Sequence, residues 1–97
     1  MEIFVEKDRI TTKTEHGIAE VDYNMLDSNT ISFYRVYVPV EDRSKGIAEE
    51  LCIEAFKYAI EKGLKIVPDC PYIRYTFLKK HPEYMQFVIE NYGEDKQ

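Results

Sequence analysis

The sequence has few of the features that mark membrane, secreted or metal-binding proteins. It contains no apolar run long enough to cross a bilayer, and Met1–Glu6 lacks the basic start and the apolar stretch of a signal peptide. Its only cysteines, Cys52 and Cys70, lie in different local patterns without metal-ligand spacing. We therefore expect a cytoplasmic protein with two reduced thiols, no membrane association and no bound metal.

An excess of basic residues is also absent. The chain has 18 acidic and 13 basic side chains, which gives a formal net charge of −5 at pH 7. Nucleic acids and anionic membranes attract a basic excess, so we expect neither as a partner, and any anion site must be local. Internal repeats and Pro/Gly/Ser-rich linkers are missing as well. With 97 residues, the chain is predicted to form a single domain spanning 1–97.

The first half of the chain is typical of β-strands. A short strand pair is predicted around a tight turn at Lys7–Arg9, and Gly17–Tyr23 alternates with period two. Leu26–Asn29 then supplies turn residues. Thr30–Val38 is rich in β-branched and aromatic residues on both faces, which predicts a central strand that is covered on both sides. The strand should end at Pro39, which has no N–H to donate.

The second half changes to a helical period. From Ser44 onward, apolar residues follow the three-four spacing of one helix face, namely Ala48, Leu51, Cys52, Ala55, Phe56 and Ala59. Gly63 should end this helix, and Leu64–Val67 should form a strand. Pro71 can open a helix that runs through Leu78, and Pro82 can open the last helix. The order predicts a mixed α/β (α+β) fold, in which a mostly antiparallel sheet includes a parallel strand-helix-strand unit.

The loop before the long helix is a suitable seat for phosphate. A helix start offers unpaired N–H groups and the positive end of the helix dipole. Arg43 and Lys45 add positive charge there, and Gly46 removes a side chain that would meet a ligand. The same residues also suit an ordinary strand-to-helix turn with Ser44 as the N-cap. The spacing alone favours the ordinary turn.

A family resemblance favours the phosphate site. The pattern Arg43-x-x-Gly46-x-Ala48 after a Val-Tyr-Val strand resembles the acyl-coenzyme-A pyrophosphate loop of the Gcn5-related N-acetyltransferase (GNAT) superfamily. In that family the preceding strand hydrogen-bonds the pantetheine arm. The resemblance implies that acetyl-CoA or coenzyme A is bound by Val36, Val38, Arg43, Ser44, Lys45, Gly46, Ile47 and Ala48.

A second stretch narrows the resemblance. Gly63–Tyr72 carries a P-x-C-x-Y pattern and is followed by His81–Tyr84, H-P-E-Y, as in a subfamily of small predicted acetyltransferases. This implies a minimal GNAT fold, in which two neighbouring strands splay to admit pantetheine. The chain departs from that subfamily at Arg35, where its members have histidine. No strand glutamate is an obvious general base, although Glu20 is possible.

Three residues after the last strand are candidates for catalysis. Cys70 would occupy the N-cap of the helix that opens at Pro71, where the helix dipole favours a thiolate that could accept the acyl group. It could equally be a packing residue. Tyr72 and Tyr75 could each protonate the departing thiolate. The expected function is acetyl transfer to an unidentified amine or thiol acceptor, and the alternative is a non-catalytic coenzyme-A-binding or protein-interaction module.

Overall fold

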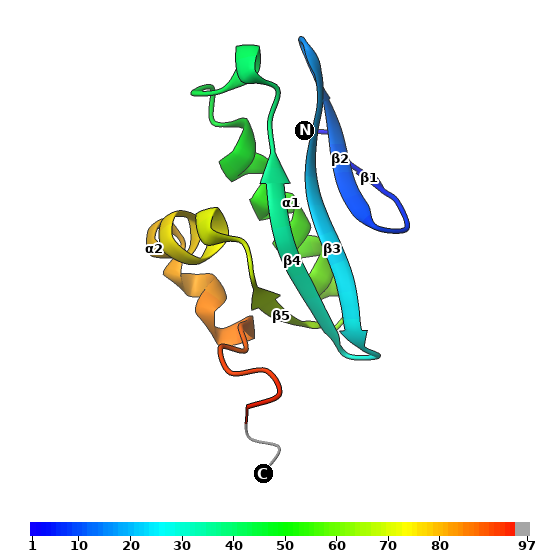
Figure 1. Ribbon diagram of the computed structural model, residues 1–97, viewed down its shortest axis with the longest axis vertical. Coiled ribbons are helices and arrows are strands. Elements are labelled where there is room, and N and C mark those ends of the chain that lie inside the picture. The colour runs from blue at the N-terminus through cyan, green and yellow to red at the C-terminus, as the bar shows by residue number, and fades with distance from the viewer. Residues whose placement is uncertain (95–97) are drawn as a thin grey trace.

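The computed structural model describes residues 1–94, which form one five-stranded sheet with helical segments against it (Figure 1). The strands lie in the order in which they occur in the chain. The first three pairings are antiparallel and the last one is parallel, which confirms the predicted mixed α+β fold. The strands are β1 (Phe4–Val5), β2 (Arg9–Thr14), β3 (Gly17–Asp27), β4 (Thr30–Tyr37) and β5 (Lys65–Pro68).

Helix α1 (Ile47–Glu61) connects β4 to β5 and packs on one face of the sheet (Figure 1). Five of the six residues of its predicted apolar face are buried, namely Leu51, Cys52, Ala55, Phe56 and Ala59, and Ala48 is partly buried. The ring of Phe56 lies 5.5 Å from that of Phe33 on β4 and 5.1 Å from that of Phe77. These contacts join the sheet, α1 and the C-terminal helical segment into one apolar core.

The end of α1 is also as predicted. Gly63 has a φ of 74°, and its N–H donates to the carbonyl of Ile60, while the N–H of Leu64 donates to that of Ala59. These bonds satisfy carbonyls that the last helical turn leaves open. The chain then turns directly into β5, so α1 and β5 are held together at this end of the sheet.

The prediction that the central strand is covered on both sides holds for Thr30–Phe33, which are all buried, and is wrong from Tyr34 onward. Neighbouring β3 residues pair with Phe33 and Arg35, so Tyr34 is an extra residue on β4 and its side chain is 42% exposed. Such a bulge shifts the alternation of a strand by one residue. Before the bulge Phe33 points into the core, and after it Val36 and Val38 do so. The bulge therefore turns two candidate binding residues toward the α1 side of the sheet.

Three predicted boundaries also differ. β3 continues through Asp27, which leaves only Ser28 and Asn29 for the turn. The predicted strand Leu64–Val67 is shifted by one residue and includes Pro68. The proline is accommodated because β5 lies at the edge of the sheet.

The C-terminal segment is helical from Pro71 to Lys80, with a π-helix η2 (Ile73–Phe77) that leads into a single turn α2 (Leu78–Lys80). The prediction of a full last helix from Pro82 is wrong. The segment η3 (Pro82–Phe87) is a short 3₁₀ helix, and Val88 then lies beside β5 in a parallel bridge. Among residues 1–94, no helix is both long and apolar enough to cross a membrane.

Candidate functional site

The site lies where β4 and β5 diverge at their carboxyl ends. The two strands pair from Thr30 to Phe33, and just beyond β5 the N–H of Cys70 donates to the carbonyl of Phe33 at 3.0 Å. β4 continues to Tyr37, paired with β3 on its other side. Within residues 1–94, the opposite edge of β4 has no strand partner after Phe33. Its backbone groups are therefore available to an extended ligand.

A cavity of about 490 Å³ occupies the space beside this free edge. Its walls are the end of β4, the loop and first turn of α1, and the helical segment of η2 and α2. The predicted binding residues among its lining are Val36, Val38, Arg43, Ser44, Gly46, Ile47 and Ala48. Asp42, Glu49, Tyr72, Thr76 and Lys80 complete the lining. Seven of the eight predicted binding residues, all except Lys45, are thus gathered around one cavity.

The loop leaves the start of α1 open. The prediction that Ser44 is the N-cap is wrong, because α1 begins at Ile47 and its N-cap is Gly46, which has a φ of 81°. No side chain among residues 1–94 caps this end, so within that range the first N–H groups of the helix have no side-chain partner. Ser44 also has a positive φ, 69°. Two left-handed residues fold the loop back and turn the positive end of the helix dipole toward the cavity.

The two basic side chains of the loop have different partners. Arg43 donates from Nε to the carbonyl of Val38 at 2.8 Å, and its guanidinium lies 5.6 Å from the centre of the Tyr37 ring. This holds a positive charge at the cavity wall. Lys45 does not line the cavity. Its ammonium is instead 3.0 Å from Asp42 and 3.3 Å from Glu15.

Asp42, at the end of the short 3₁₀ helix η1 (Val40–Asp42), anchors the loop to the turn between β2 and β3. Its side chain is fully buried and accepts bonds from the Thr14 hydroxyl at 2.7 Å, the His16 backbone N–H at 2.9 Å and Lys45. The His16 Nδ1 is 2.8 Å away. The His16 ring, followed by Thr14, holds the pKa of the Asp42 carboxyl well below its usual value.

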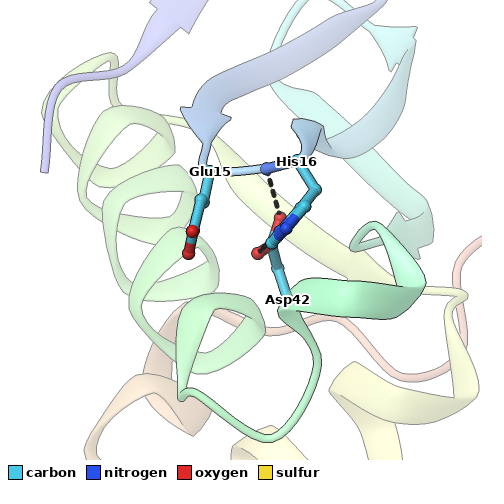
Figure 2. Close-up of side chains that lie close together, drawn as sticks. All are labelled: Glu15, His16 and Asp42. Carbon is cyan, nitrogen blue, oxygen red and sulfur yellow. Dashed lines mark hydrogen bonds and ion pairs between the residues drawn. The ribbon is translucent and has the colours of Figure 1, made fainter.

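Glu15, His16 and Asp42 converge from two segments of the chain (Figure 2). Their potential ligand atoms lie within 4.8 Å of one another, a spacing that a metal could use. Both carboxylate oxygens of Asp42 already accept hydrogen bonds, however, and the ammonium of Lys45 supplies the local positive charge. We therefore assign the cluster to holding the loop.

A second polar pair closes the cavity at its helical side. His81 Nε2 lies 2.6 Å from a carboxylate oxygen of Glu49, and Lys80 Nζ is 3.8 Å from the other oxygen. The His81 contact, together with Lys80, lowers the pKa of Glu49. Neither Glu49 nor Lys80 is predicted from the sequence. Glu49 is an acidic residue in the first turn of α1, and this position together with the later His81 is the sequence signal for the pair.

The three candidate catalytic residues differ in their surroundings. Cys70 is 5% exposed and does not line the cavity, although its N–H marks the point where the strands separate. Its carbonyl accepts the N–H of Arg74, which is the N-cap position that the sequence predicts. Tyr72 lines the cavity, and burial raises its pKa to about 12. Tyr75 is 71% exposed and lies outside the cavity lining. Cys52 is buried in the core, where desolvation raises its pKa strongly.

Comparison with known proteins identifies the family. The sequence profile of the GCN5-related N-acetyl-transferase family matches residues 8–88, and the chain belongs to this family. The fold is similar to the NMR solution structure of a GCN5-like protein from Staphylococcus aureus, described as a candidate N-acetyltransferase. That comparison has a TM-score of 0.67 at 20% sequence identity and covers 99% of this chain and 96% of the other. The predicted superfamily is confirmed.

Proposed function

We propose that the protein binds acetyl-CoA in the cavity between β4 and α1 and transfers its acetyl group to an acceptor. The observation that carries the proposal is the uncapped start of α1 directly beside the unpaired edge of β4. The first suits a pyrophosphate, and the second suits the amide groups of a pantetheine arm. Family membership supports the same chemistry.

In this arrangement different residues bind different parts of acetyl-CoA. The backbone at Gly46, Ile47 and Ala48 holds the pyrophosphate, and Arg43 adds positive charge at the same end. The side chains of Val36 and Val38 give the cavity wall an apolar stretch for the pantetheine arm. The thioester then reaches the point where β4 and β5 separate.

We assign the role of general acid to Tyr72 rather than Tyr75. Tyr72 borders the cavity, and its phenol is protonated at neutral pH. It can therefore give its proton to the coenzyme A thiolate as the carbon–sulfur bond breaks. The exposed ring of Tyr75 has no such access.

A covalent route through Cys70 is a second proposal, because this residue follows β5 at the point of divergence. Its sulfur would attack the thioester carbonyl, the bond to the coenzyme A sulfur would break, and the thiol proton would end on that sulfur. The acceptor would then take the acetyl group and restore the Cys70 thiol. The near-complete burial of Cys70 requires local opening before this attack.

Two measurements test these proposals. Acetyl-CoA that binds only the folded protein must raise the melting temperature, and an unchanged temperature at saturating ligand would refute cofactor binding. Mass spectrometry of the intact protein after incubation then reports an acetyl adduct. The adduct should be absent from Cys70→Ala and present in Cys52→Ala if the covalent route operates. An adduct that persists in Cys70→Ala would rule that route out.

The alternative function is a coenzyme-A-binding or protein-interaction module without turnover. Arg35 favours this non-catalytic module. Similar sequences have a histidine here that could serve as the base, whereas this chain has an ion-paired arginine. Release of free thiol from acetyl-CoA in the presence of amines separates the two functions. Binding without any thiol release would support the module.

A further inference from the structure

One wall of the cavity has no role in the proposed function apart from Tyr72. This helical wall is the segment 71–80, which follows β5 and lies beside α1 (Figure 1). It contributes Tyr72, Thr76 and Lys80 to the cavity lining, and side chains four residues apart lie on the same face of a helix. Eight helical residues advance the chain on the order of 10 Å. Because Tyr72 follows the point where β4 and β5 separate, Lys80 marks the opposite end of the helical wall.

Lys80 lies beside the start of α1. Its Nζ is 3.8 Å from a carboxylate oxygen of Glu49, which is the third residue of that helix. A carboxylate at this position often bonds back to the N-cap N–H group. Glu49 extends instead to the helical wall, where His81 Nε2 is 2.6 Å from its other oxygen. The ammonium of Lys80 is thus next to the helix start that the proposed function assigns to the pyrophosphate.

The ion pair between Lys80 and Glu49 is loose. At 3.8 Å the two atoms are beyond hydrogen-bond distance, and the Lys80 side chain is 64% exposed. Among residues 1–94 its ammonium donates no hydrogen bond. An exposed ion pair of this kind contributes little to stability. Lys80 can therefore turn to an incoming anion at little cost, while the contact with His81 keeps Glu49 in place.

The cavity presents its two basic side chains on different walls. Arg43 belongs to the loop before α1, where its Nε donates to the carbonyl of Val38 at 2.8 Å. Lys80 belongs to the helical wall. Coenzyme A likewise carries phosphate at two separate places, the pyrophosphate in its chain and a 3′-phosphate on its ribose. Since the helix start and Arg43 suit the pyrophosphate, the charge of Lys80 is left for the 3′-phosphate.

We propose that Lys80 binds the ribose 3′-phosphate and makes the protein select coenzyme A over 3′-dephospho-coenzyme A. This inference rests on the proposed function and adds a selectivity to it. An ammonium group is a compact charge with three donors, so it can bind phosphate oxygens from several directions. The coenzyme then lies with its thioester near Tyr72 and its nucleotide near Lys80.

The charge of the rest of the protein works against this selectivity, so its source must be local. The formal net charge is −5, and Glu49 places a carboxylate in the cavity lining. Both repel the additional phosphate that coenzyme A carries relative to the dephospho form. A preference for coenzyme A therefore requires a positive side chain at that phosphate, and removal of this side chain should abolish or reverse the preference.

The test is calorimetric titration of coenzyme A and of 3′-dephospho-coenzyme A into the protein at low ionic strength. We expect the wild type to bind coenzyme A about tenfold or more tightly than the dephospho form, because one charge-assisted bond is added. Lys80→Gln should lose this preference, and Lys80→Arg should keep it. Lys79→Gln is the matched control, since it removes the same charge from the adjacent exposed residue, which lies outside the cavity lining. Melting curves show whether each variant is folded.

Each outcome decides the role of Lys80. Equal affinity of the wild type for the two ligands overturns it and leaves the proposed function standing. A similar loss of preference in Lys79→Gln and Lys80→Gln also overturns it, because it would indicate diffuse attraction by the helical wall. If Lys80→Gln weakens the binding of both ligands by the same factor, the side chain contacts the pyrophosphate and the proposal is wrong. Binding of neither ligand by the folded wild type refutes the proposed function itself.

Discussion

Gly46 and Gly63 lie at opposite ends of α1 and provide a matched pair for testing the pyrophosphate site. Their φ values are 81° and 74°, and a Cβ atom added to either would meet no other atom within 4 Å. The cost of Gly46→Ala or Gly63→Ala is therefore conformational, about 1–2 kcal/mol for a left-handed residue with a side chain. For a chain of this size, each kcal/mol lowers the melting temperature by about 4–8 °C.

The two variants should differ in ligand binding even though they lose similar stability. Gly46 borders the cavity, so its new methyl group would stand where the phosphate oxygens approach the first helical N–H groups. Loss of one charge-assisted bond weakens coenzyme A binding about tenfold or more. Gly63→Ala should leave the affinity unchanged. Calorimetric titration at a temperature where both variants are folded measures the difference, and equal affinities would refute the placement of the pyrophosphate.

Two further predictions concern the loop anchor and the general acid. Asp42→Asn should lower the melting temperature at neutral pH. Because the pKa of Asp42 is lower in the folded protein, its contribution to the free energy of unfolding is fully present above the ordinary carboxyl pKa of 3.8. This contribution is lost as the pH falls through the folded-state pKa. The gap between wild type and variant should therefore shrink in strong acid, and a gap that does not vary with pH would contradict the assigned role. Tyr72→Phe should reduce thiol release from acetyl-CoA by about a hundredfold, whereas Tyr75→Phe should not. Similar losses of thiol release in both variants would show that Tyr72 is not the general acid because of its place beside the cavity.

The sequence contains the information for the fold wherever one local pattern is decisive. The spacing of Leu51, Cys52 and Phe56 identifies the buried face of α1 without ambiguity, because a single stripe of the helix is apolar. Gly63 marks its end for an equally local reason, the left-handed conformation that follows the last turn. A strand, a helix and a second strand in this order then predict a parallel pair.

The features that the sequence does not reveal depend on contacts between distant segments. The bulge at Tyr34 follows from the register between β3 and β4, and an alternating apolar sequence gives no sign of it. Asp42 is of a residue type that is typical of a solvent-exposed turn. It is nevertheless buried, because Thr14 and His16 of the β2–β3 hairpin donate hydrogen bonds to it. The strand register likewise sets Asp22 between Arg9 and Arg35, which no local pattern indicates.

The most direct test of the proposed cofactor site is an NMR titration of the ¹⁵N-labelled protein with coenzyme A. We expect large shifts for the backbone amides of residues 44–49, where the helix start would contact the pyrophosphate, for Val36 on the free edge of β4, and for Val38 directly after that strand. The amides of Arg9, Glu20 and Asp22, on strands β2 and β3 away from the cavity, should change little. Saturation with coenzyme A that leaves the amides of Gly46, Ile47 and Ala48 unmoved would contradict the central claim.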